Sequence, residues 1–198
     1  MTTKNYAVAA SADDAVEISG TVTINGTNGV LSAAARYGGL SFDTAADPIA
    51  QGAPITSATL TYRPASTSND SPDMTWKGHK VVNSTQYTTG ANNISDRWST
   101  NPTTATASDV GTDVGTGARD IVVTSIVQEL VNQASWGSTS RIGLIARPNG
   151  PASGSVTFYD NGSNYATLQV VVADAGQPMI ARGRLVPGMR RPHGYQGW

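Results

Sequence analysis

The clearest helical pattern in the chain lies between Val123 and Ala134. Apolar residues recur there at intervals of three and four, as on one face of an α-helix. They are Val123, Ile126, Val127, Leu130, Val131 and Ala134. Thr124 or Ser125 can cap the start, and Ser125 has the capping-box spacing to Gln128. The pattern predicts one short helix that closes one end of a β-sandwich.

Short segments rich in β-branched residues, separated by turn residues, make up most of the remaining chain. Alternation is cleanest in 55–63, where Ala58, Leu60 and Tyr62 are expected on one side. Further strands are predicted at 5–10, 15–18, 21–25, 35–42, 74–82, 107–110, 121–123, 142–146, 155–159 and 166–172. About ten strands at roughly 10- to 15-residue spacing predict an all-β fold, a jelly-roll-like antiparallel β-sandwich. Segments 64–72 and 83–101 are expected to be loops, with Trp98 packed under the second.

Composition limits the possible functions. The 198 residues include 21 glycines, 10 prolines and no cysteine, which suits one domain with many turns. Absence of cysteine excludes disulfides, zinc sites built on thiolates and cysteine nucleophiles. The sequence has no run of about 18 apolar residues, so no membrane span is predicted. The first residues lack the apolar centre of a secretory signal, so we expect assembly in the cytoplasm.

Charge divides the chain into two parts. All 14 acidic residues lie at or before Asp174, together with nine of the 13 basic residues, so residues 1–174, the body, carry a net charge of −5. Residues 175–198, the C-terminal tail, carry +4. The tail is rich in proline and glycine, which favour an extended segment that becomes ordered on a partner. We expect its basic and large apolar side chains to bind another protein, since Trp, Tyr and Arg dominate interface energies. These are Arg182, Arg184, Met189, Arg190, Arg191, Tyr195 and Trp198.

Three stretches of the body resemble DNRLRE-type domains, which are β-sandwich modules related in shape to carbohydrate-binding jelly rolls. The stretches are Tyr37–Asp43 followed by Ile55–Leu60, Asp120–Asn132, and Val156–Asp160 with Thr167–Val172. Leu130 stands where the family usually has Trp, and 160–164 replace its usual turn. The resemblance covers about residues 5–172.

The overall build is similar to that of bacteriophage virion proteins. A free-standing sandwich with a basic, aromatic tail resembles a head decoration or cement protein, and a tail or fibre component is an alternative. This resemblance implies a homotrimer in the virion whose partners are capsid or other virion proteins. Many weakly bound copies anchored by their tails would stiffen a shell through effective concentration.

Two acidic or polar clusters raise the question of a metal site. Asp13, Asp14 and Glu17 could supply oxygen ligands to calcium, as could the polar turn 160–164. Neither has a recognisable calcium motif, so we favour solvated turns and expect no metal or cofactor. The tail arginines could neutralise phosphates, but their spacing favours protein over nucleic acid.

Candidate residues for chemistry are few. His79 and His193 lie in unrelated contexts, and no nucleophile motif accompanies them, so we expect no enzymatic activity. Exposed aromatic residues could instead stack on sugars, which makes a module for cell-surface glycans the alternative function. The aromatic residues that could do so are Tyr6, Tyr37, Trp76, Tyr87, Trp98, Trp136 and Tyr165. Tyr87 and Tyr165 lie in polar stretches and are the candidate glycan contacts, whereas Trp76 and Trp136 are expected in the core.

Overall fold

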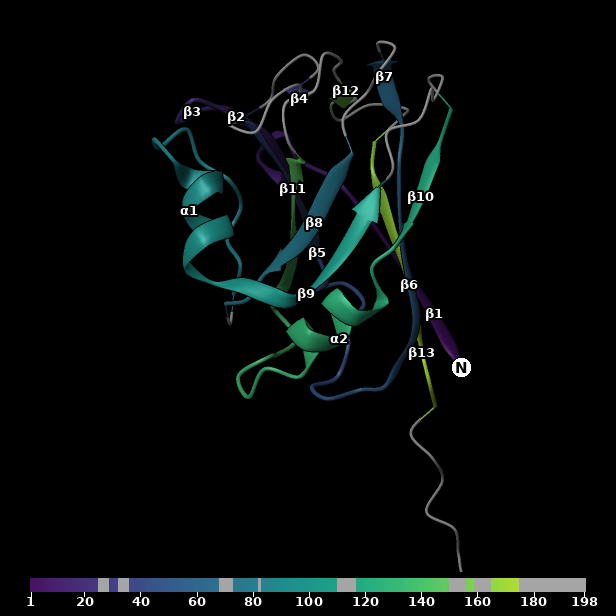
Figure 1. The fold of residues 1–198 in the computed structure, drawn as a ribbon. Coiled ribbons are helices and arrows are strands. Elements are labelled where there is room, and N and C mark those ends of the chain that lie inside the picture. The colour runs from purple at the N-terminus through teal and green to yellow at the C-terminus, as the bar shows by residue number, and fades with distance from the viewer. Residues whose placement is uncertain are drawn as a thin grey trace, which may run out of the picture.

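The protein is an antiparallel β-sandwich with two short helices (Figure 1). The computed structural model describes residues 1–24, 29–31, 36–67, 73–81, 83–109, 117–149, 156–158 and 165–174. The predicted all-β sandwich is therefore confirmed. The prediction of one helix is wrong, since a helix at Asn93–Thr100 (α1) accompanies the expected one at Thr124–Val131 (α2). Among the described residues, no helix has the length and apolar character needed to cross a membrane.

Sheet A has four antiparallel strands. In spatial order they are β1 (Thr2–Ala7), β13 (Thr167–Val172), β6 (Ile55–Tyr62) and β10 (Arg119–Val122). Alternation along β6 places Ala58, Leu60 and Tyr62 in the core, as the sequence pattern predicts. β13 pairs on one side with β1 and on the other with β6, so the body ends on an interior strand of this sheet.

Sheet B has six strands and faces sheet A. In spatial order they are β3 (Thr21–Ile24), β2 (Asp14–Ile18), β5 (Arg36–Asp43), β11 (Arg141–Pro148), β8 (Met74–His79) and β9 (Pro102–Asp109). A single turn of 3₁₀-helix, Ser11–Asp13, leads into β2. A third, three-stranded sheet consists of β4 (Gly29–Leu31), β12 (Val156–Phe158) and β7 (Pro64–Thr67).

The main core fills the space between the two large sheets. Leu60 and Leu168 from sheet A meet Phe42, Trp76 and Leu144 from sheet B, and all five are buried. The ring of Tyr62 also crosses between the sheets, with its centroid 5.8 Å from that of Trp76. Burial of Trp76 and Trp136 confirms that both tryptophans belong to the core.

Helix α2 (Thr124–Val131) closes one end of the sandwich (Figure 1). It contacts β6 of sheet A and β8 and β9 of sheet B, and buries Ile126, Val127, Leu130 and Val131. The predicted helix and its position are thus confirmed. Its predicted capping is wrong, because no side chain caps the helix start. The hydroxyl of Thr124 instead accepts from the backbone N–H of Ala58 at 2.9 Å.

Helix α1 (Asn93–Thr100) lies in the segment that the sequence analysis treats as a loop. It covers the outer face of sheet B, where Ile94 and Tyr87 pack with Ala15, Val22 and Ile145 in a second apolar cluster. Trp98 packs at the edge of this cluster, as expected, although on a helix rather than under a loop.

Candidate binding surfaces

Two of the three acidic residues at the start of the body, Asp13 and Glu17, are structural acceptors rather than parts of a solvated turn. Glu17 is buried, and its carboxylate accepts from the backbone N–H groups of Ile94 at 2.8 Å and Ser95 at 2.9 Å. Asp13 is buried as well and forms an ion pair with Arg141. Among the described residues, no group of three or more His, Cys, Asp or Glu side chains is placed to hold a metal ion. The polar turn 160–164 lies outside the described residues.

A buried ion pair connects the two large sheets. Asp109 at the end of β9 pairs with Arg119 at the start of β10, and Tyr62 donates its hydroxyl hydrogen bond to the same carboxylate. The guanidinium of Arg119 also lies 5.8 Å from the centroid of the Tyr62 ring. Burial raises the pKa of Asp109 above its usual value, opposed by the hydrogen bond from Tyr62 and the charge of Arg119. This cluster holds sheet A to sheet B, and its three side chains are buried where a ligand has no access.

His79 and Ser84 form a pair that invites comparison with a catalytic base and nucleophile. His79 Nδ1 lies 2.9 Å from Ser84 Oγ. Ser84, however, has an exposed fraction of 0%, and its hydroxyl lies against the backbone of Gly143, where a substrate has no access. Burial and the nearby charge of Arg97 lower the pKa of His79 to about 4, which leaves it a weak base. The geometry gives this pair a packing role.

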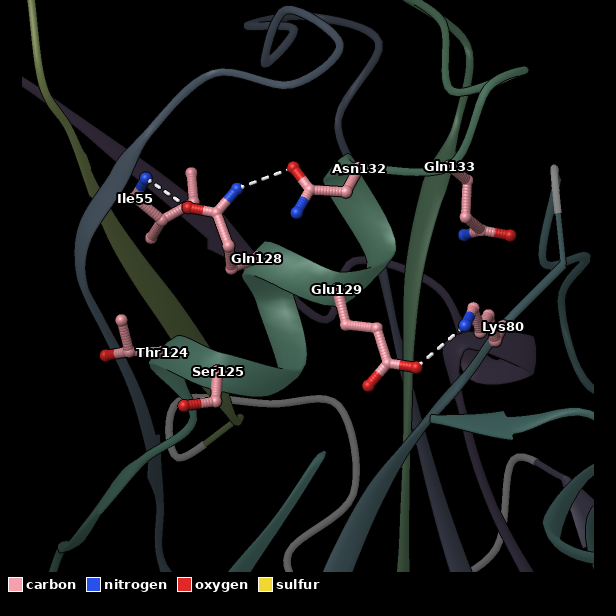
Figure 2. Close-up of a pocket in the computed structure, with 8 residues that line it drawn as sticks. All are labelled: Ile55, Lys80, Thr124, Ser125, Gln128, Glu129, Asn132 and Gln133. Atoms are coloured by element: carbon pink, nitrogen blue, oxygen red, sulfur yellow. Dashed lines mark hydrogen bonds and ion pairs between the residues drawn. The ribbon is translucent and has the colours of Figure 1, made fainter. Parts of the chain in front are cut away.

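An open groove of about 500 Å³ lies along α2. Figure 2 shows that Gln128 and Asn132 extend toward Ile55 on one side of the helix, while Glu129 extends toward Lys80 on the other. Thr124, Ser125 and Gln133 complete the lining. Uncharged amides and hydroxyls, with one compensated ion pair, suit a polar chain better than a highly charged ligand.

Several lining side chains of this groove already have protein partners. Gln128 accepts from the backbone N–H of Ile55 at 2.7 Å and donates to Asn132 Oδ1 at 2.9 Å. Glu129 accepts from the N–H groups of Thr104 at 3.0 Å and Ala105 at 2.9 Å, and pairs with Lys80 at 2.9 Å. Burial raises the pKa of Glu129, but the bonds from Ala105, Lys80 and Thr104 outweigh it, so the pKa is lowered. The groove is therefore a rigid surface rather than a reactive site.

A second surface combines two aromatic rings with two cations on the outer face of sheet B. Tyr37 and Trp98 are partly exposed, with ring centroids 6.0 Å apart and planes inclined at 58°. Lys77 Nζ lies 4.5 Å from the centroid of the Trp98 ring, and the guanidinium carbon of Arg147 lies 5.6 Å from that of Tyr37. We call these four residues the Tyr37–Trp98 surface. Aromatic faces beside polar groups are typical of ligand contacts, and the same contacts also hold α1 on the sheet.

The two predicted glycan contacts differ in their positions. Tyr87 has an exposed fraction of 1%, and its hydroxyl donates to the carbonyl of Leu144 at 3.1 Å. The prediction for Tyr87 is wrong, because the segment 84–92 folds over sheet B and buries the ring. Tyr165, just before β13, is 44% exposed and stays a candidate.

The predicted partner-binding residues of the tail lie outside the described residues. They are Arg182, Arg184, Met189, Arg190, Arg191, Tyr195 and Trp198. What the structure describes is the root of the tail, where Ala173 donates its N–H to the carbonyl of Pro54 at 2.9 Å. Asp174 pairs there with the amino group of Met1. The tail thus starts at the end of the sandwich where β1 and β6 begin.

The sequence names Tyr37 and Trp98 among its aromatic candidates but does not bring the Tyr37–Trp98 surface together, because its members come from four separate elements. Tyr37 lies on β5, Lys77 on β8, Arg147 on β11 and Trp98 on α1. Alternation along each strand indicates which side its residues face, but not which strands are neighbours. The unexpected α1 was also needed to bring in Trp98.

Comparisons with known proteins add no relative to this description. No family model matches the chain, and no curated protein matches it. The fold therefore defines the class, an all-β sandwich, and the resemblance to DNRLRE-type domains stays a prediction.

Proposed function

We propose that the protein is a structural component of a bacteriophage virion, a head decoration or cement protein whose C-terminal tail fastens the body to the shell. The observation that carries this proposal is the attachment of the tail to β13. This strand is hydrogen-bonded on both sides, to β1 and to β6. A force along the tail is thus resisted by two rows of backbone hydrogen bonds, one to β1 and one to β6, that would have to shear together. This arrangement suits a tether.

The charge distribution supports the same role. The body has a net charge of −5 and the tail a net charge of +4, so the two parts present different surfaces to a partner. The buried ionisable clusters of the described body hold strands and helices together, which favours a scaffold over an enzyme. We further propose that the copies assemble as trimers on the shell and that the tails bind capsid or other virion proteins.

Truncation tests this role. A chain that ends at Asp174 should fold with an unchanged melting temperature and should lose most of its occupancy on particles. The full chain with Arg63→Ala, an exposed arginine of the body, serves as the control and should bind like the parent. Equal occupancy of the truncated chain and the full chain would contradict the proposal.

Glycan binding is the second candidate function, and the Tyr37–Trp98 surface is the observation that favours it. A glycan array probed with the full chain would test it, with Trp98→Ala and Tyr165→Ala as variants. Gln86→Ala, an exposed residue beside buried Tyr87, is the control. Binding that is lost in Trp98→Ala but kept in Gln86→Ala supports the surface. Binding unaffected by both aromatic substitutions, or absent from the array, counts against it.

A further inference from the structure

We propose that the two cations of the Tyr37–Trp98 surface, Lys77 and Arg147, bind an extended acidic segment of a partner protein in which two carboxylates stand two positions apart. The inference rests on the proposed function only in taking that partner to be a virion protein. A contact on the outer face of sheet B, in addition to the tail, would fix the orientation of the body on a shell.

The register of two neighbouring strands sets the distance between the two cations. Arg147 of β11 lies opposite Thr75 of β8, and Lys77 follows Thr75 by two positions. The adjacent residues Trp76 and Ala146 are buried in the core, so both cations lie on the outer face of the sheet. Diagonal neighbours of this kind lie about 7 Å apart.

This distance matches the side-chain spacing of an extended peptide. Successive residues of a β-strand rise by about 3.3 Å, so side chains two positions apart lie on the same side, about 6.6 Å from each other. One carboxylate can then bind Lys77 while the next binds Arg147, whose guanidinium can donate to both carboxylate oxygens. Carboxylates on adjacent residues point to opposite sides of the strand and cannot bind both cations.

The two aromatic rings leave the cations, rather than flat ring faces, for a ligand. Lys77 Nζ lies 4.5 Å from the centroid of the Trp98 ring, and the guanidinium carbon of Arg147 lies 5.6 Å from that of Tyr37. The rings contact each other at an angle of 58° and form no continuous platform. Sugars and nucleic-acid bases stack on open aromatic faces, whereas a carboxylate needs a cation held in place, which packing on a ring provides.

The local charge favours an acidic ligand. Among the described residues, no carboxylate forms an ion pair with Lys77. Glu17 is bonded to the start of α1, Asp109 is paired with Arg119, and Asp73 lies just before β8, at the end of the strand. The body as a whole carries −5, so a surface with two cations is where an acidic segment meets the least repulsion.

Two peptides of equal composition test the spacing. One has four Glu-Thr repeats, and the other has two Glu-Glu-Thr-Thr repeats, in which no glutamates stand two positions apart. Each is titrated into the isotope-labelled full chain and followed by NMR. We expect the Glu-Thr peptide to bind about fivefold more tightly, which corresponds to one partly exposed ion pair, and to shift the backbone amides of Lys77 and Arg147 and the indole N–H of Trp98.

Charge variants of the full chain locate the contact. Lys77→Gln should weaken binding of the Glu-Thr peptide about fivefold, and Lys77→Arg should restore most of it. Arg63→Gln changes an exposed arginine next to β6 and is the matched control, while Arg182→Gln makes the same change in the tail. Both should bind the peptide like the parent. Arg147→Gln replaces Lys77→Gln if that variant has an altered melting temperature.

Three outcomes would overturn the proposal. They are equal affinities for the two acidic peptides, no binding of either, and equal losses in Lys77→Gln and in one of the controls. Tighter binding of an oligogalacturonate or a single-stranded oligothymidylate, lost in Lys77→Gln, would assign the surface to a glycan or a nucleic acid and overturn it as well. Failure here leaves the proposed function standing, because truncation is scored on particles. Failure of the truncation test leaves the peptide contact standing, because it is measured on the free chain.

Discussion

The carboxylate of Glu17 on β2 accepts a 2.8 Å hydrogen bond from the backbone N–H of Ile94, in the first turn of α1. It also accepts from the N–H and the hydroxyl of Ser95. A residue 77 positions away in the sequence thus does the work of a helix cap, since Asn92 makes no capping bond with its side chain. This contact fixes α1 on the outer face of sheet B and completes the Tyr37–Trp98 surface.

Replacing Glu17 should therefore loosen α1. In Glu17→Leu, the N–H groups of Ile94 and Ser95 lose the oxygen that accepts both of their hydrogen bonds. We expect the free energy of unfolding to fall by about 1–3 kcal/mol in urea titrations. Asp96→Asn, on the exposed side of the same helix, is the matched control and should stay within about 0.5 kcal/mol of the parent. Similar values for both variants would show that Glu17 does not hold the helix.

Close packing at Gly39 makes a second prediction. A Cβ at this position would collide with Cζ of Tyr87, whereas a Cβ at Gly137 would meet no atom within 4 Å. Gly39→Ala should force the buried ring of Tyr87 to move, at a cost of about 1–3 kcal/mol. Gly137→Ala should be close to neutral. A neutral Gly39→Ala, measured in the same urea titration, would contradict the packing of the segment 84–92 on sheet B.

The buried ion pair between Asp109 and Arg119 predicts a strong asymmetry. Asp109→Asn leaves the Arg119 charge buried without its counter-charge, and we expect a loss of about 3–5 kcal/mol. The double variant Asp109→Leu with Arg119→Met removes both charges and should lose less. Asp120→Asn, next to Arg119 but exposed and bonded to Thr61, is the control. Equal losses in the single and double variants would mean that the charges do not interact across the sheets.

His79 should make stability depend on pH. Its pKa is about 4 in the folded state and 6.5 by the reference value, so between these pH values the unfolded chain binds a proton that the folded chain does not. The contribution of His79 therefore lowers the free energy of unfolding as pH falls from about 6.5 to 4, and this loss is reversed as pH rises. His79→Asn can keep a hydrogen bond to Ser84 and should flatten this part of the profile. The test is the unfolding free energy of parent and variant at pH 7 and at pH 4.5: relative to the variant, the parent should lose about 2 kcal/mol at the lower pH. A constant difference would contradict the burial of the imidazole.

Local patterns in the sequence predicted most of the large sheets. The alternation in 55–63 and the helical recurrence in 123–134 reflect how each segment divides between core and solvent. β4 and β7 were missed because they are short and exist by pairing with β12. Strand β9 begins at Pro102, earlier than expected, and the carboxylate of Glu129 binds the N–H groups of its residues Thr104 and Ala105.

Helix α1 and the binding surfaces escaped prediction for a related reason. The apolar burial of α1 depends mainly on Ile94, and its stability comes from Glu17 and from Arg97, which donates to the carbonyl of Thr85 at 2.7 Å. No local pattern in 93–100 reports those partners. The partner of Gln128 could not be predicted locally either. Its spacing from Ser125 suggested a capping box, but its side-chain carbonyl accepts from the backbone N–H of Ile55.

A reconstruction of the complete assembled particle tests the central claim most directly. The account predicts density for residues 175–198 in contact with a different chain, with arginine and aromatic side chains of the tail at that contact. Density that places these residues wholly on their own body in the particle, with no other chain touching them, would contradict it.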